Sequence, residues 1–178
     1  DDRGRSRLVV QNDVGQRNAF ETHSGQLAMT WSPAADLLAY TSPRLNARLG
    51  GGPLRLLDPA TGESSLLSKR NALAFFWSPD GDTIAYITLP ENDDNNVRVA
   101  AVGSGRRLMA RPQRQAIEIR LELWAVDVAG GHQRRLAQFA PTSRFMRQFL
   151  PYFDQYSLSH RIWSPDSDAL VLPVIEDG

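Results

Sequence analysis

The stretch WSPDGDTIAY at residues 77–86 determines the fold, because the chain repeats it in two other places. WSPAADLLAY occupies residues 31–40, and WSPDSDALVL occupies residues 163–172. In each copy the proline fixes φ and the short residues after it accept turn conformations, so the chain reverses direction there. The residues that follow the turn are apolar, β-branched or aromatic, as expected of a buried strand. Each copy therefore predicts two antiparallel strands joined by a short turn.

A second element also recurs, in which an apolar strand is followed by Asp, a glycine-containing turn and another strand. LRLLDPATGESSLL at 54–67 matches LWAVDVAGGHQRRL at 123–136, and LVVQNDVGQRNAF at 8–20 is a weaker copy. Internal similarity of this kind is the signature of a repeat architecture. Together the two elements predict a unit of four antiparallel strands. The Trp-Ser-Pro turn follows the first strand, and the Asp turn joins the third to the fourth.

The spacing of the repeats indicates the type of unit. Trp31 and Trp77 are 46 residues apart, close to the roughly 40–45 residues of a propeller blade. Trp77 and Trp163 are 86 residues apart, and no Trp-Ser-Pro turn lies between 90 and 160. We therefore predict one blade that carries two insertions, near 90–117 and 140–158.

The predicted fold class is all-β, with β-propeller blades of four antiparallel strands in an incomplete ring of about three blade-equivalents. A short helical or loop insertion is expected near 142–156. The whole chain, 1–178, is predicted to be a single propeller segment. Its expected parts are a half blade at 1–27, a blade at 28–72, a blade at 73–141 with the insertion at 90–117, and an insertion followed by a half blade at 142–178.

Composition excludes several classes of protein. Twenty Lys and Arg residues balance twenty Asp and Glu residues, which argues against a chain built to bind nucleic acid or an anionic membrane. The chain has no cysteine, which excludes disulfides and thiolate chemistry. No run approaches 18 apolar residues, so no membrane span is expected. Hydrophobic content of 42% with 22% charged residues is typical of a folded domain.

Residues 77–86 and the hairpin DPATGE at 58–63 resemble the TolB-type, WD-repeat-like β-propeller family. The repeat of that family is similar to Trp-Ser-Pro-Asp-Gly, then Ile-Ala-Tyr, then a strand that ends in Asp with Thr-Gly-Glu. Residues 163–168 lack only the glycine, whereas residues 31–36 depart most from the pattern. The chain is also similar to the propellers of dipeptidyl peptidase and prolyl oligopeptidase-type proteins.

The resemblance implies blades arranged around a central channel, with the first strand of each blade nearest the channel. It implies a non-catalytic segment that acts as a protein-interaction scaffold or binding module outside the cytoplasm, in the periplasm or at the cell surface. One alternative is the propeller cap of a serine peptidase-like protein whose hydrolase domain lies outside this chain. A second alternative is a propeller that binds an ion or another ligand. No enzyme activity, catalytic residue, cofactor or metal site is predicted.

The residues that define the repeats are predicted to be structural. We expect the three Trp residues to occupy equivalent positions and to pack between neighbouring blades. The Ser and Asp side chains of the turns are expected to bond to local backbone groups. The predicted structural residues are Trp31, Pro33, Asp58, Gly62, Trp77, Pro79, Asp80, Gly81, Asp127, Gly130, Trp163, Pro165 and Asp166.

The segment FMRQFLPYFDQY at 145–156 is the candidate recognition surface. Its aromatic residues recur at helical spacing, although Pro151 disfavours a continuous helix. Two interpretations stay open: a short helix and loop that pack over one end of the propeller, or an aromatic patch that docks a partner. The candidate partner-binding residues are Phe145, Phe149, Tyr152, Phe153 and Tyr156.

Other polar segments offer weaker candidates. Asp154, Ser157 and His160 could be arranged as a catalytic triad, but only on paper. PENDDNN at 90–96 contains the oxygen ligands that calcium favours, but it lacks an EF-hand pattern. The arginine-rich stretch at 98–120 lacks aromatic residues for base stacking. A solvated loop is the simpler interpretation of each segment.

The number of blades gives one further expectation. Closed propellers use about four to eight blades, so three blade-equivalents leave sheet edges open. Either the chain continues outside this sequence or two copies combine. From counting alone we predict a homodimer that completes a six-bladed ring. The resemblance implies a protein partner, and we expect no nucleic-acid partner.

Overall fold

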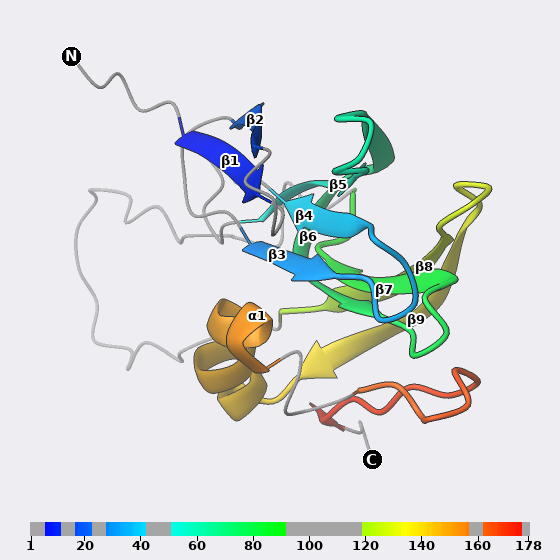
Figure 1. Cartoon of the computed structure of the whole chain (residues 1–178). Coiled ribbons are helices and arrows are strands. Elements are labelled where there is room, and N and C mark those ends of the chain that lie inside the picture. The colour runs from blue at the N-terminus through cyan, green and yellow to red at the C-terminus, as the bar shows by residue number, and fades with distance from the viewer. Residues whose placement is uncertain are drawn as a thin grey trace, which may run out of the picture.

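The structure is a computed structural model that describes residues 6–11, 17–22, 28–41, 51–91, 119–156 and 162–175. These residues form an eight-stranded antiparallel sheet, a separate two-stranded sheet and a short helical segment (Figure 1). Strand order in the large sheet follows chain order from β3 to β10, so every strand lies beside its neighbour in sequence. In this part of the chain, no helix is long and apolar enough to cross a membrane.

The large sheet consists of propeller blades joined end to end, which confirms the predicted fold class. The first blade contains β3 (Ala28–Trp31), β4 (Leu38–Thr41), β5 (Gly52–Leu57) and the first half of β6 (Ser64–Trp77). The second blade contains the rest of β6, with β7 (Thr83–Thr88), β8 (Leu121–Asp127) and β9 (Gln133–Pro141). Each blade is a meander of four antiparallel strands.

Strand β6 passes from the first blade to the second at Ala72. Ala72 pairs with Gly52 of β5 on one side and with Thr88 of β7 on the other, and the register shifts next to it. Gly51 approaches this junction so closely that a Cβ on it would lie 2.4 Å from the Ala72 carbonyl oxygen. Its φ of 77° also favours glycine. A glycine at position 51 therefore lets β6 serve both blades.

Strand β10 (Val174–Ile175) marks the start of a third blade. Val174 pairs with Pro141 at the end of β9. Pro141 and Ala72 each lie 14 residues after the Asp of their hairpin turn, and Val174 and Thr88 each lie 11 residues after their Trp. The pair of Val174 with Pro141 is thus the equivalent of the pair of Thr88 with Ala72. The helical segment is inserted directly after this junction.

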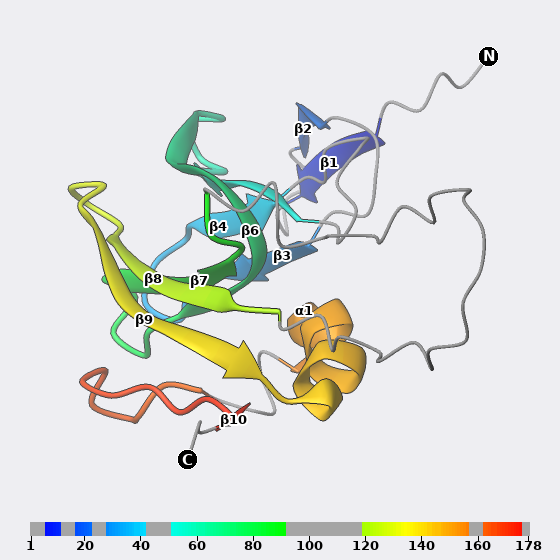
Figure 2. The ribbon, with the colours of Figure 1, turned by 180° about the vertical axis from the view of Figure 1, so that it is seen from behind.

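The inserted segment is a chain of three short helical turns. They are the π-helix η1 (Phe145–Phe149), the 3-10 helix η2 (Leu150–Tyr152) and α1 (Phe153–Tyr156). This agrees with the helical or loop insertion predicted near 142–156. Pro151 lies at the beginning of η2, where its missing N–H is not needed. Helix α1 contacts β3 and β6, so the segment covers one end of the blades (Figure 2).

The two-stranded sheet is the hairpin of β1 (Ser6–Gln11) and β2 (Arg17–Thr22). Val10 of β1 packs against the outer face of the first blade, on a buried cluster of Leu38, Tyr40 and Leu57. The hairpin lies in the part of the sequence predicted to supply half of a preceding blade. The division of the chain at 27, 72 and 141 stays a prediction.

One hydrophobic core joins the two whole blades, the start of the third and the helical segment. Consecutive residues of β6 and β7, with most of β8, supply much of it, because these strands are buried on both faces. The largest fully buried side chains are Leu54, Leu57, Phe75, Ile84, Tyr86, Ile87, Leu121 and Val126.

Candidate functional site

Short-range hydrogen bonds stabilise the Trp-Ser-Pro turns. In the second copy the Ser78 hydroxyl donates to a carboxylate oxygen of Asp80 at 2.5 Å and accepts from the Thr83 amide at 3.0 Å. Ser164 and Asp166 repeat the hydroxyl–carboxylate bond at 2.5 Å. These bonds to Ser78 and Ser164 are the main cause that lowers the pKa of Asp80 and of Asp166. The Ser and Asp side chains therefore bond within their own turns.

The turns of successive blades also contact one another. A Cβ on Gly81 would lie 2.8 Å from the Ala34 Cβ and 2.9 Å from the Ser32 hydroxyl of the first turn. The Asp80 amide donates to the Ser167 hydroxyl of the third turn at 3.2 Å. Ser167 stands where the second copy has glycine and keeps a φ of 66°. Small residues in these turns let consecutive blades approach.

The repeated Trp residues connect blades through the backbone. The indole Nε1 of Trp77 donates to the Thr30 carbonyl at 3.2 Å, and Nε1 of Trp163 donates to the Phe76 carbonyl at 3.1 Å. In both cases the acceptor is the residue directly before the Trp of the preceding blade. Trp31 differs because its side chain is exposed and no described residue accepts from its indole nitrogen.

The aromatic side chains of the helical segment lie mostly against the sheet. The ring of Phe153 meets those of Phe75 and Phe76 edge-on, with centroids 5.3 and 5.9 Å apart. Phe149 stacks on Phe76 at 6.0 Å and on Phe145 at 5.2 Å. Phe145 and Phe153 are buried, and Phe149 is half-buried. These three rings anchor the segment to the blades.

This arrangement narrows the candidate recognition surface. Phe145 and Phe153, two of the five predicted partner-binding residues, are held in the core and present no surface to a partner. Tyr152, by contrast, is 48% exposed. The side chain of Tyr156 lies outside the described residues. A partner-binding role thus stays a prediction for the exposed Tyr152 and for the half-buried Phe149.

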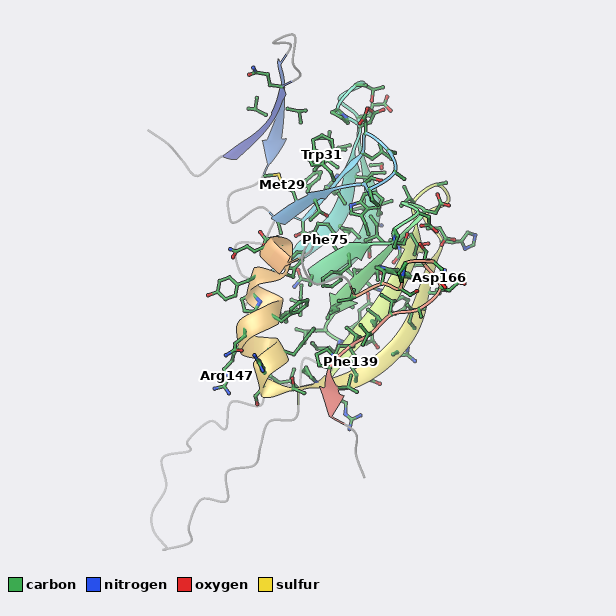
Figure 3. The ribbon with its side chains drawn as sticks, turned by 60° about the horizontal axis from the view of Figure 1, so that its bottom comes forward. Met29, Trp31, Phe75, Phe139, Arg147 and Asp166 are labelled. Carbon is green, nitrogen blue, oxygen red and sulfur yellow. The ribbon has the colours of Figure 1, made fainter. Side chains whose placement is uncertain are left out.

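Two arginines of the segment, Arg144 and Arg147, are exposed like Tyr152, and the sequence reasoning missed them. Arg144 Nε donates to the Gln148 amide oxygen at 3.0 Å, and Arg147 Nε donates to the Ser143 carbonyl at 3.3 Å. Both arginines are exposed, and Figure 3 shows Arg147 directed away from the sheet. The signal was present in their spacing from the buried Phe145 and Phe149, which places them on the other face of the turns.

A second polar cluster lies on β8 and β9, beside the start of the insertion at 90–117. Glu122 is buried and accepts hydrogen bonds from Trp124 Nε1 and Arg135, each at 2.9 Å. The Arg70 guanidinium lies 3.9 Å from the centroid of the Trp124 ring and forms an ion pair with Glu91 at 2.8 Å. The two carboxylates and two guanidiniums compensate one another. This cluster therefore stabilises the sheet and leaves no uncompensated charge for a ligand.

Most of the weaker sequence candidates fall outside the described residues. These include Ser157, His160, the acidic loop after Glu91 and the arginine-rich stretch before Arg120. Asp154 is exposed on α1. Within the described ranges, no group of three or more His, Asp or Glu side chains could hold a metal ion.

Comparison with known proteins gives likenesses in structure only. No protein-family model matches the chain, and no curated protein matches it. Solved structures do match, and they include an acylaminoacyl peptidase from Pyrococcus horikoshii, at 15% identity over 76% of this chain with a TM-score of 0.47. TolB from Acinetobacter baumannii matches at 16% identity over 79% of this chain, with a TM-score of 0.40. An oligogalacturonate lyase from Vibrio parahaemolyticus matches at 15% identity over 73%, with a TM-score of 0.43.

All three are β-propeller folds. The chain spans 20%, 32% and 33% of their respective lengths, so it corresponds to a fraction of each. They include TolB as well as enzymes, and they leave the specific role of this chain open.

Proposed function

We propose that the chain is a non-catalytic TolB-like propeller segment that binds a protein partner through the outer side of its helical insertion. The observation that carries this proposal is the exposure of Arg144, Arg147 and Tyr152 on a segment that buried rings anchor to the sheet. Tyr and Arg are the residue types that most often dominate protein interfaces.

The anchoring of the helical segment to the sheet should increase the affinity for a partner. Because the rings of Phe149 and Phe153 pack on Phe75 and Phe76 of the sheet, the segment is held in place before a partner arrives. Binding to a preorganised surface loses less conformational entropy. The Nε atoms of Arg144 and Arg147 are already bonded within the segment, which leaves their terminal NH groups to face outward. A partner with a carboxylate beside an aromatic or aliphatic pocket fits this surface.

The test begins with a partner captured from an extract on the immobilised chain and then purified. Its affinity is measured by calorimetry against the parent chain, Tyr152→Ala, Arg147→Ala and the control Leu136→Ala, which replaces an exposed apolar residue of β9. We expect Tyr152→Ala and Arg147→Ala to weaken binding at least about tenfold, equivalent to about 1.4 kcal/mol. Unchanged affinity in both variants, or equal loss in the control, would contradict the proposal.

The non-catalytic part of the proposal has its own test. The chain is incubated with aminoacyl and acylaminoacyl p-nitroanilides, because propellers of peptidase-type proteins are similar to it. No turnover above background is expected. Turnover that a serine-directed inhibitor abolishes would refute the non-catalytic assignment.

We also propose a location outside the cytoplasm, on the resemblance of the Trp-Ser-Pro-Asp-Gly repeats to the TolB-type family. The absence of cysteine is compatible with that location and with others. Fractionation of cells that express the native protein tests it, and recovery of the protein with cytoplasmic markers would contradict it.

A further inference from the structure

The first blade exposes a face that the second blade buries. Met29 on β3 occupies the position that Phe75 occupies in the second blade, yet Met29 is 45% exposed and Phe75 is fully buried. Trp31 is 51% exposed, whereas its equivalent Trp163 is 8% exposed. Figure 3 shows Met29 and Trp31 at the β3 end of the sheet, far from Phe139 at the β9 end. The face of the first blade is therefore open at Met29 and Trp31.

The start of the third blade exposes a face of the opposite kind. Val171 is 67% exposed, although its equivalent Ala85 in the second blade is fully buried. Leu170 and Leu172, on the other side of the same strand, pack against the core. The third blade is therefore open at Val171, just as the first blade is open at Met29 and Trp31.

The backbone edges at these two places are complementary. The Val171 amide donates to the Ile162 carbonyl at 2.8 Å, so the amides of Leu170 and Leu172 point to the opposite edge. No described strand pairs with them there. Strand β1 likewise pairs only with β2 among the described strands. Residues 162–175 thus supply the first two strands of a blade, and the β1–β2 hairpin supplies strands of the kind expected third and fourth.

We propose that a second copy of the chain occupies both edges, so that β1 of one copy pairs antiparallel with residues 170–172 of the other. In this junction Trp31 Nε1 donates to the Ile162 carbonyl of the second copy. Ile162 directly precedes the Trp of its own blade, which is the relationship seen for both described Trp donors. The proposal does not depend on the role of Tyr152.

The register of the junction follows from the two complete blades. Ala39 pairs with Leu56 in the first blade, and Val171 is the equivalent of Ala39. Val10 is the equivalent of Leu56. Each lies one residue before the last residue that pairs across its hairpin, which is Gln11 in β1 and Leu57 in β5. Both also face the blade that follows, since Val10 packs on the first blade. Val171 should therefore lie opposite Val10, and Leu172 opposite Val9.

Symmetry closes the assembly. A two-fold axis makes the two junctions identical, so each copy gives and receives the same contacts. Each copy contributes two whole blades, and each of the two junctions forms one more blade from strands of both copies. The result is a six-bladed ring, within the range of about four to eight blades that close. The pairing also removes the free edges of β1 and of residues 170–172, which would otherwise template aggregation.

The first measurement is the mass of the 178-residue chain by light scattering over a range of concentrations. We expect a species of twice the 19.8 kDa chain mass. Trp31→Glu should raise the dissociation constant of this dimer at least about tenfold, because the charge enters a buried contact. Circular dichroism and thermal unfolding show whether the variant is folded. A chain that stays monomeric at high micromolar concentration overturns the proposal, as does an open series of larger species.

Engineered cysteines test the register, since the natural chain has none. Val10→Cys with Val171→Cys should form interchain disulfides on mild oxidation, because the two residues are expected directly opposite each other. The matched control is Val9→Cys with Val171→Cys, which places the thiols on opposite faces of the sheet and should not cross-link. Equal cross-linking in both pairs, or a disulfide within one chain, contradicts the predicted junction.

Discussion

The indole nitrogen of Trp163 donates to the carbonyl oxygen of Phe76 at 3.1 Å, across 87 residues of sequence. Trp77 makes the same contact with Thr30 across 47 residues. The first strand of each blade is therefore tied to the first strand of the preceding blade at the same depth. The repeat conserves a contact between blades as well as a turn within each blade.

We expect Trp163→Phe and Trp77→Phe each to lower the free energy of unfolding by about 1–2 kcal/mol. Phenylalanine keeps most of the buried ring but removes the donor, and a lost hydrogen bond is worth about 1 kcal/mol. Urea unfolding monitored by circular dichroism measures the change. Tyr152→Phe, at an exposed site, is the control and should change stability by less than about 0.5 kcal/mol. Parent-like stability in both Trp variants would show that the contact contributes nothing.

Gly51→Ala should destabilise the chain by more than about 2 kcal/mol, because the new Cβ meets the Ala72 carbonyl and φ is positive. Gly131→Ala is the matched control, since its φ is 64° and no atom lies within 4 Å of a Cβ there. It should lose only the cost of the left-handed conformation, about 1–2 kcal/mol. Urea midpoints compare the two variants, and equal losses would contradict a steric requirement at the β6 junction.

Phe153→Ala should cost about 3–5 kcal/mol, the usual loss for a buried aromatic residue. Tyr152→Ala, one position earlier, should cost less than about 0.5 kcal/mol because its side chain is largely exposed. Thermal unfolding of the two variants separates the anchoring side of the segment from its outer side. A large loss in Tyr152→Ala would assign that ring to the core and remove it from the recognition surface.

Tyr86→Phe should cost about 1–2 kcal/mol, because its hydroxyl lies in a buried network 3.2 Å from the Ser68 hydroxyl and 2.8 Å from Gln133 Oε1. Burial raises the pKa of Tyr86. Tyr40 holds the equivalent position in the first blade, with one partly buried contact to Ser64 at 2.8 Å. Tyr40→Phe should therefore cost only about 0.5 kcal/mol. Denaturant unfolding of both variants tests the difference, and the reverse order would refute it.

Acid should weaken the turns of the second and third blades. The pKa values of Asp80 and Asp166 are lowered from 3.8 in the folded chain. Their contribution is therefore complete above 3.8 and is lost as pH falls through the lower folded value. Asp80→Asn with Asp166→Asn should reduce the stability lost below 3.8 and should also lower stability at neutral pH. Urea midpoints across the acid range measure this, and an unchanged acid slope would count against the assignment.

The repeats were predictable because the interactions that define them are local. In the second copy, the bonds of the Ser78 hydroxyl to Asp80 and Thr83 span no more than five residues along the chain. The hairpin turns of Asp58 and Asp127 are equally local, so residue type and spacing reveal them. The insertion after Pro141 was predictable for the same reason, since it interrupts a regular spacing.

The candidate site was predictable only in part. Helical spacing located the aromatic segment, but several faces of a short helical turn carry rings. Only the packing of Phe153 against Phe75 and Phe76 shows which face is buried. Arg147 was missed because the sequence does not show on which side of the segment an arginine lies. That becomes known only from the packing of the rings.

Residue types and their spacing are enough to show that this chain is built from four-stranded propeller units, because turn chemistry and strand periodicity act over a few residues. How the units meet appears only in the folded chain: Trp163 bonds to Phe76, Glu122 pairs with Arg135 through the register of β8 and β9, and Trp31 is exposed. These features depend on which distant strands become neighbours. That choice is made by burial of the shared core, which no local pattern records.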